Sequence, residues 1–170
     1  MLKIRDEIDK DIDAITNITA MAFCTKENIN PIEQFIIIGL RQANALVISL
    51  VAEKNGRIIG HIAFSPVSIS DGSTGWFGLG PISVLPKYQR QGIGSALINK
   101  GLMLLKQKNA MGCCVVGDPQ YYNRFNFRIE KKLVYKEVPP EFFLVLPFEK
   151  SIPTGCVTFH EGFSVEQRNN

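Results

Sequence analysis

A glycine-containing segment, residues 89 to 95 (Gln-Arg-Gln-Gly-Ile-Gly-Ser), is the part of this chain best suited to chemistry. It follows an apolar segment that ends at Leu85, and apolar residues with helical spacing begin at Ile93. Glycines at the start of a helix leave backbone N–H groups uncovered, and the helix dipole adds positive potential there. The segment therefore predicts a loop that holds a phosphate or pyrophosphate group.

The spacing of this loop differs from two well-known phosphate-binding loops. No Gly-Lys-Ser/Thr closes it, which excludes the Walker A loop. The dinucleotide fingerprint needs a third glycine where this chain has Leu97, and the acidic residue expected about 20 residues later is missing. The remaining pattern is Gln-x-x-Gly-x-Gly-Ser after a strand, and Lys87 and Arg90 beside it would attract an anion.

A second segment of chemical interest follows the apolar residues 113 to 116. Asp118 is a good N-cap and Pro119 a good first helical residue, so a short helix is predicted to begin here. This helix carries Tyr122, whose phenol could donate a proton during a reaction. The alternative is a tyrosine that only packs, with its hydroxyl satisfied inside the fold.

Composition limits the class of protein. The chain has 170 residues, of which 45% are apolar and 21% charged, as in an ordinary globular domain. A net charge of +3 without a Lys/Arg run gives no support for nucleic-acid binding. No apolar run is long enough to span a membrane, and the N-terminus does not read as a signal peptide. We therefore expect a cytoplasmic protein with no nucleic-acid and no membrane partner.

The four cysteines fit a reducing compartment and give no metal site. Cys24, Cys113, Cys114 and Cys156 lack the spacings of zinc ligands. Neighbours on a strand point to opposite faces, so Cys113 and Cys114 should not pair. A nucleophilic Cys114 served by His61 is an alternative that nothing in the spacing supports.

The predicted elements form a mixed order of helices and strands. One helix is expected after Asp9, and another after Asn30-Pro31 with Ile32, Phe35, Ile36 and Leu40 facing inward. Strands are predicted over residues 3–5, 46–53, 58–65, 76–85, 113–116 and 142–146, with a further strand before residue 138 and a hairpin turn at 54–57. Three successive isoleucines, residues 36 to 38, cannot all face one core. We expect them to contact a second copy in a homodimer or to line a substrate cavity.

Several segments together resemble the GNAT superfamily of N-acetyltransferases, and the YhbS-like group most closely. Besides the loop, they are residues 60–67, 78–81, 117–119 with Tyr121-Tyr122, and 138–141, and the resemblance runs from about residue 2 to residue 148. It implies an α/β (α+β) GNAT fold: a mixed, mostly antiparallel central sheet of about six to seven strands, with helices on both faces and a splay between the two central strands. It assigns residues 1–150 to one acetyltransferase domain, and leaves residues 151–170 as a C-terminal extension with one more strand and a frayed tail.

The resemblance implies an enzyme that moves an acetyl group from acetyl-CoA to a primary amine, on a small molecule or peptide, by direct attack in a ternary complex. In it, a strand binds the pantetheine arm, the loop binds the pyrophosphate, and Tyr122 protonates the leaving thiolate. Asn126 stands where the family has glycine, and the backbone N–H near Val84 is the implied oxyanion donor. The cofactor-binding residues implied are Ile82, Ser83, Val84, Gln89, Arg90, Gln91, Gly92, Ile93, Gly94 and Ser95.

The general base stays unassigned at this point. No carboxylate occurs from Trp76 to Lys87, and the candidates elsewhere are His61 and, less favoured, Glu53 and Glu130. A water molecule is a further alternative, and the sequence does not name the acceptor. A rival class is a GNAT-fold module that binds acyl-CoA as a regulator or sensor without transferring the acyl group.

Overall fold

Local sequence signals set several element boundaries in the computed structural model, which describes residues 1 to 165. Asn55 and Gly56 both have positive φ angles and form the tight turn between strands β2 (Ile48–Lys54) and β3 (Arg57–Ile69). The Asp118 carboxylate accepts a hydrogen bond from the Gln120 N–H at 2.9 Å and caps α4 (Pro119–Tyr122). The turn that follows α4 ends at Asn126, which has the left-handed conformation (φ 69°). These local predictions are confirmed.

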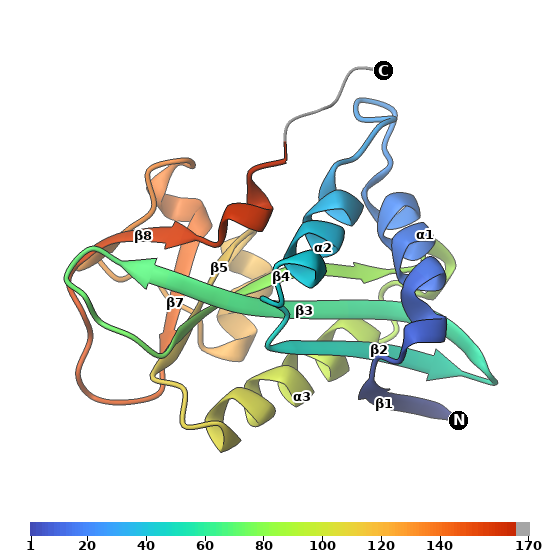
Figure 1. Ribbon diagram of the computed structural model, residues 1–170, viewed down its shortest axis with the longest axis horizontal. Coiled ribbons are helices and arrows are strands. Elements are labelled where there is room, and N and C mark those ends of the chain that lie inside the picture. The colour runs from blue at the N-terminus through green and yellow to red at the C-terminus, as the bar shows by residue number, and fades with distance from the viewer. Residues whose placement is uncertain (166–170) are drawn as a thin grey trace.

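The remaining helices and strands alternate along the chain (Figure 1). The helices are α1 (Ile12–Phe23), α2 (Glu33–Gln42) and α3 (Ile93–Gln107). The strands are β1 (Leu2–Asp6), β4 (Trp76–Val84), β5 (Gly112–Val116), β6 (Leu133–Val134), β7 (Phe143–Pro147) and β8 (Gly155–Phe159). Short 3₁₀ turns, η1 (Asp9–Asp11), η2 (Pro86–Tyr88), η3 (Asn123–Phe125), η4 (Pro140–Phe142) and η5 (Glu161–Phe163), join them.

The strands form a mixed, mostly antiparallel sheet in the order β1-β2-β3-β4-β5-β7. β4 and β5 are parallel, and β8 pairs with β3 on one side and with β6 on the other. α1 and α2 pack on one face and α3 on the other (Figure 1). The predicted GNAT architecture is confirmed. The sheet has eight strands rather than six or seven because the C-terminal segments add β6 and β8.

The two central strands separate halfway along their length. β4 pairs with β5 only from Trp76 to Gly78, opposite residues 112 to 114. Beyond that point β5 continues along β7, and the register between β3 and β4 shifts by one residue at Gly80-Pro81. Proline has no N–H for a ladder and glycine weakens a strand, so this is where a strand tolerates a bulge. The predicted splay is confirmed.

The main core lies between the sheet and α3. Leu97, Ile98 and Leu105 of α3 are fully buried against Phe64 and neighbouring strand residues. The Phe64 ring occupies the space that a side chain at Gly101 would fill, so α3 can lie close to the sheet only because that residue is glycine. This close packing holds α3, the helix that follows the predicted phosphate loop, firmly in place.

Two predictions about the N-terminal helices are wrong. α1 begins at Ile12, after the turn η1, and Asp11 rather than Asp9 carries the polar contacts, with Arg5 and the Ile8 N–H. α2 begins at Glu33 rather than after Asn30-Pro31. Its inward face holds Ile37 in place of Phe35, which is 49% exposed.

The run of isoleucines has an explanation within the chain. Ile36 packs with Leu40 and Ala45, while Ile37 packs with Ile15 and Val51 in a different cluster. A homodimer through this helix stays a prediction.

The C-terminal segment packs onto the splayed sheet. Val67 to Ile69 of β3 pair with β8, and the Phe159 ring lies directly on Gly78, where β4 and β5 part. Gly162 of η5 contacts Leu40 of α2. The strand predicted in the C-terminal extension is therefore found at Gly155–Phe159. Of the predicted frayed tail, residues 166 to 170 lie outside the described residues.

Candidate functional site

The predicted phosphate loop presents free backbone N–H groups at the start of α3. Arg90 and Gly92 both have left-handed conformations (φ 59° and 81°), which turn the chain sharply before the helix. The first hydrogen bond of the helix runs from the Ala96 N–H to the Gly92 carbonyl, so the amides of residues 93 to 95 have no acceptor within the helix. An anion would find several donors and the positive end of a long helix at this position.

The edge of β4 provides a second set of free backbone groups. The Leu85 N–H donates to the Ile59 carbonyl at 2.9 Å, and in an antiparallel ladder the residues directed at the partner strand alternate. The backbone N–H and C=O groups of Ser83 therefore point toward β3. Those of Ile82 and Val84 point to the opposite side, where β5 no longer pairs with β4. The Gln89 side chain donates to the Val84 carbonyl at 3.0 Å.

A cavity of about 240 Å³ lies where these two sets of groups meet. It joins the free edge of β4 to the first turn of α3. Its lining residues are Ile82, Val84, Tyr88, Gln89, Arg90, Gly94 and Tyr121. Five of the ten predicted cofactor-binding residues thus share one cavity.

The other five predicted residues have different surroundings. The Ser83 hydroxyl lies 3.2 Å from that of Thr19, away from the free edge of β4. The Gln91 side chain donates to the Lys87 carbonyl at 3.1 Å and shapes the loop. Ile93 is buried in the core, while Gly92 caps α3 and Ser95 is half-buried in its first turn.

Tyr121, to which the sequence assigned no role, lines this cavity and packs partly against the core. Its hydroxyl lies 2.8 Å from the position that a Cβ atom on Gly94 would take. The Arg124 guanidinium stacks on its ring at 4.7 Å from the ring centroid and brings a further cation to the loop. α4 is a single helical turn, so successive tyrosines face different directions. This difference in direction between neighbouring residues is the feature from which a second role, for Tyr121, could have been predicted.

Tyr122 lies at the inner side of the same helix. Its ring packs edge-on against Tyr121 and Phe127, and the residue is 8% exposed. Burial, with smaller effects of Tyr121 and Cys113, raises the pKa of Tyr122 well above its usual value. The phenol therefore keeps its proton at neutral pH.

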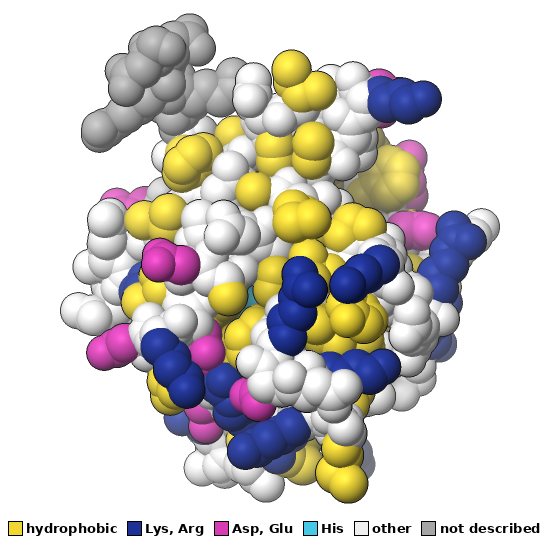
Figure 2. Space-filling view, turned by 90° about the vertical axis from the view of Figure 1, so that its right-hand side faces the viewer, with side chains coloured by type: hydrophobic (Ala, Val, Ile, Leu, Met, Phe, Trp, Pro, Cys, Tyr) yellow, Lys and Arg dark blue, Asp and Glu magenta, His cyan; other side chains and the backbone are white. Residues whose placement is uncertain are grey.

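Basic side chains surround the end of the sheet where this cavity opens. Lys87 and Lys54 both approach the Tyr88 ring, at 4.9 and 5.6 Å from its centroid, and Arg90 is exposed beside them. Figure 2 shows this end of the molecule, where several Lys and Arg side chains lie across an apolar surface. Such a surface attracts an anionic ligand that also has an apolar part.

His61 is buried in a polar network on the α1 and α2 side of the sheet. Ser49 donates to the Glu7 carboxylate, and the Ser49 oxygen lies 2.7 Å from His61 Nε2. Arg41 forms an ion pair with Glu7 at 3.0 Å. This pattern assigns the proton of a neutral imidazole to Nε2 and leaves Nδ1 without a partner.

The pKa values of the network follow from burial and pairing. Burial lowers the pKa of His61, and the nearby Glu7 carboxylate offsets this only in part. Burial alone would raise the pKa of Glu7, but hydrogen bonds from His61, Arg41 and Ser49 lower it to about 2. His61 is therefore a fixed, neutral part of the core, and its position does not reach the cavity described above.

We expect the free energy of unfolding to decrease as the pH falls below about 6.5, the usual pKa of histidine. The unfolded chain takes up a proton there that folded His61 resists, so the unfolded state binds more protons and stability rises with pH. Glu7 adds to the loss only at lower pH, below the usual glutamate range. Urea titrations between about pH 5 and 8 measure this slope.

The chain offers a matched control for this prediction, because it has two histidines. His61→Gln should flatten the slope, whereas His160→Gln should keep it, because His160 directly precedes η5 and its side chain only caps that turn. An unchanged slope in His61→Gln would assign the pH dependence to other groups.

Neither carboxylate candidate for the base reaches the cavity. Glu53 forms an ion pair with Arg5 at 2.8 Å, and Glu130 accepts a hydrogen bond from the Lys132 N–H in a surface turn. Within residues 1 to 165, no group of three His, Cys, Asp or Glu side chains could hold a metal ion. Burial raises the pKa of both Cys113 and Cys114, and no cysteine of the described region forms a disulfide.

The sequence matches the model of the acetyltransferase (GNAT) family over residues 12–127, which include the loop and the start of the α4 segment. Among curated proteins, the uncharacterized N-acetyltransferase YhbS of Escherichia coli K12 is 35% identical over 98 residues. That match covers 57% of this chain and 59% of YhbS, so the chain spans less than two thirds of the length of this relative.

Two solved structures resemble this one over nearly their whole length. A GNAT family acetyltransferase from Brucella melitensis, crystallised with acetyl-CoA, is 42% identical with a TM-score of 0.85, covering 96% of this chain and 98% of its own. The YhbS structure from Escherichia coli, in complex with CoA, is 29% identical with a TM-score of 0.88, covering 96% and 92%. With a family match over more than half of its length, this chain belongs to the GNAT acetyltransferase family.

Proposed function

We propose that this protein is an acetyl-CoA-dependent N-acetyltransferase that transfers the acetyl group to a primary amine on a small molecule or peptide. The observation that carries the proposal is the cavity between the free edge of β4 and the first turn of α3. A thioester with a long amide-containing arm and a pyrophosphate needs both features, an unpaired strand edge and a helix N-terminus. The related Brucella melitensis protein was crystallised with acetyl-CoA, which supports this choice of ligand.

In this proposal the pantetheine arm lies along β4 as an added strand. Ile82 supplies backbone hydrogen bonds to the arm, and Val84 lies beside the thioester end of the arm. Ser83 supports this strand from the opposite side through its position between β3 and α1. The pyrophosphate lies on the N–H groups of residues 92 to 95, with Gln89, Arg90 and Gln91 shaping the loop. Lys87, Arg90 and Arg124 supply the attraction for the charged end of the cofactor.

The chemistry follows from the thioester. The amine attacks the acetyl carbonyl, and the oxyanion that forms is stabilised by the Val84 N–H. Tyr122 protonates the leaving thiolate. The proton that the attacking amine loses passes to water, because Glu53, Glu130 and His61 do not reach the cavity, and water returns a proton to the Tyr122 phenolate. The reference pKa of a phenol, about 10, exceeds that of a thiol, about 8.5, so the transfer needs a dry site. Burial raises the pKa of the Tyr122 phenol, and it would also raise the pKa of a thiolate that leaves beside it, so the transfer depends on both groups sharing the same dry surroundings.

The transfer is proposed to be direct, with no acetyl-enzyme. A covalent relay needs a reactive thiolate, and Cys113 and Cys114 are fully buried with raised pKa values. Cys24 is exposed on the loop between α1 and α2, and no histidine or lysine bonds to its sulfur among the described residues. Holding amine and thioester in contact supplies much of the rate by itself.

We expect thiol release from acetyl-CoA to depend on an added amine, with initial-rate patterns of a ternary complex. A panel of polyamines, aminoglycosides, amino acids and peptides identifies the acceptor. Acetyl-CoA alone should leave the protein mass unchanged. A stable increase by one acetyl group that the amine removes, and that Cys114→Ala abolishes, would contradict the direct mechanism.

A second candidate function is a non-catalytic acyl-CoA sensor of the same fold. It would bind acetyl-CoA with the same loop but release no thiol with any amine. The buried phenol of Tyr122, which keeps its proton at neutral pH, favours the enzyme, because a sensor has no use for a proton donor there. Free cysteines throughout the described region support a reducing, cytoplasmic location for either function. No helix of the described region is long and apolar enough to cross a membrane.

A further inference from the structure

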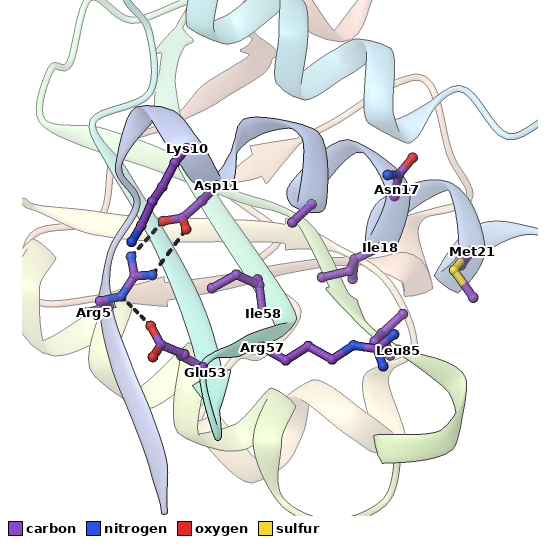
Figure 3. Close-up of a pocket in the computed structure, with 12 residues that line it drawn as sticks. Arg5, Lys10, Asp11, Asn17, Ile18, Met21, Glu53, Arg57, Ile58 and Leu85 are labelled. Atoms are coloured by element: carbon purple, nitrogen blue, oxygen red, sulfur yellow. Dashed lines mark hydrogen bonds and ion pairs between the residues drawn. The ribbon is translucent and has the colours of Figure 1, made fainter.

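A second and larger cavity, of about 600 Å³, lies on the α1 side of the sheet, between α1 and the hairpin that joins β2 to β3 (Figure 3). Its volume falls in the range of small-molecule sites. Ile18 of α1, Ile58 of β3 and Leu85 at the end of β4 give it an apolar floor, and Asn17 supplies an amide. None of its lining residues belongs to the proposed acetyl-CoA cavity.

The two ends of this cavity differ in charge. At one end the Arg5 guanidinium bonds to Asp11 at 2.6 Å and to Glu53 at 2.8 Å, so its charge is fully compensated. At the other end, Arg57 is exposed and forms no ion pair with any described residue. Figure 3 shows the Arg57 side chain extending toward Leu85. Lys10 also lines the cavity at the Arg5 end, where two cations and two carboxylates balance. The net positive charge therefore lies at the Arg57 end, nearest the cofactor loop.

Other cations reinforce this end of the cavity. Lys54, Lys87 and Arg90 lie around the same end of β4, and within residues 1 to 165 none of them forms an ion pair. Their summed field favours an anion, especially one with two charges. A protonated amine would be repelled, so this cavity does not suit the amine acceptor.

We propose that this cavity is a second ligand site, which takes a phosphate monoester attached to a flat organic group. The Arg57 guanidinium holds the phosphate, whose oxygens match its forked donors. A phosphate monoester carries a charge of about −1.5 to −2 at pH 7, which suits the cationic end. The flat group lies against the apolar wall of the cavity, which Ile18, Ile58 and Leu85 form; Ile18 and Leu85 are buried and Ile58 is half-buried.

Occupancy of this site acts on the cofactor loop through Leu85. The Leu85 N–H donates to the Ile59 carbonyl, and its carbonyl accepts from the Tyr88 N–H at 2.8 Å. Tyr88 ends the turn η2 and lines the proposed acetyl-CoA cavity. A ligand on Leu85 thus touches the segment that positions Gln89 and the loop, and alters the affinity for acetyl-CoA. This coupling rests on the proposed function, whereas the binding site itself does not.

The phosphate monoester has two sources, a free molecule or the 3′-phosphate of coenzyme A itself. Calorimetry with AMP as the probe separates these two sources. AMP is titrated into three samples: the protein alone, the protein saturated with dephospho-CoA, and the protein saturated with CoA. We expect AMP to bind the dephospho-CoA complex, and Arg57→Ala to weaken this binding about 10-fold or more, the loss of a charge-assisted hydrogen bond. Lys26→Ala, an exposed lysine on the loop between α1 and α2, is the matched control and should have no effect.

The outcomes divide clearly. AMP binding that persists with CoA assigns the site to a free phosphate monoester, and binding that CoA abolishes assigns it to the 3′-phosphate of the cofactor. No AMP binding to the dephospho-CoA complex, or binding that Arg57→Ala leaves unchanged, overturns the proposal. If neither CoA nor dephospho-CoA binds, the proposed function fails instead, and AMP titrations of unliganded protein and Arg57→Ala still test the site.

Discussion

Replacing Gly94 with valine should abolish measurable acetyl-CoA binding and leave the fold intact. A Cβ atom at residue 94 would lie 2.8 Å from the Tyr121 hydroxyl, and about 4 Å from the side chains of Ile82 and Val84. The two methyl groups of valine would then fill the space between α3 and β4 that the pyrophosphate needs. Losing two charge-assisted hydrogen bonds of about 1.5–3 kcal/mol each weakens binding by about 100-fold or more.

The control places the same residue elsewhere in the same helix. Asn99 is exposed on α3, so Asn99→Val places the same β-branched side chain in the same helix without touching the cavity. Calorimetry should show near-normal acetyl-CoA affinity for Asn99→Val and none for Gly94→Val, with matching far-ultraviolet circular dichroism. If Gly94→Val bound acetyl-CoA with a dissociation constant within a few-fold of that of the unmutated protein, this loop would not be the phosphate site.

The parts of the fold that follow from local backbone chemistry could be predicted from the sequence. Asn55-Gly56 can take the two positive φ angles of a tight hairpin turn, and Asp118-Pro119 defines the start of α4. The start of α2 could not be predicted in this way. Asn30-Pro31 matches a helix start, yet the helix begins at Glu33, because packing of Ile36 and Ile37 into two different clusters sets its position.

The candidate site was predictable where it is built from backbone. Glycines at 92 and 94, and a poor strand sequence at Gly80-Pro81, indicated a loop and a splay, and both are found. The direction of side chains was not predictable, because it depends on register and rotation in three dimensions. The Ser83 side chain, for example, points away from the cavity and lies against Thr19 of α1. The Arg57 cavity joins β1, α1 and a hairpin, which no local pattern connects.

Tyr121 and Tyr122 are a further case in which the direction of the side chains could not be predicted from the sequence. The sequence motif selects Tyr122, while the structure places Tyr121 in the cavity and Tyr122 behind it, packed against Tyr121 and Phe127. A ring that lines a binding cavity contributes to affinity, and a buried phenol with a raised pKa is held in its protonated form. The two residues should therefore differ in which kinetic constant they affect.

Tyr122→Phe should lower kcat by about 10²- to 10⁴-fold, the usual range for general acid assistance. The affinity for acetyl-CoA should change little, because the phenylalanine ring keeps the packing against Tyr121 and Phe127 and only the proton donor is lost. Pre-steady-state measurements with the identified amine ensure that the chemical step is the one observed.

Tyr121→Phe is the matched comparison, since it removes one hydroxyl from the next residue of the same helical turn. That hydroxyl lies over Gly94, so its loss should raise the dissociation constant of acetyl-CoA several-fold, in line with one hydrogen bond of about 1 kcal/mol, and leave kcat nearly unchanged. The opposite pattern, with kcat lost in Tyr121→Phe and retained in Tyr122→Phe, would transfer the role of proton donor to Tyr121. A retained kcat in both variants would mean that the thiolate leaves without a tyrosine, protonated by water.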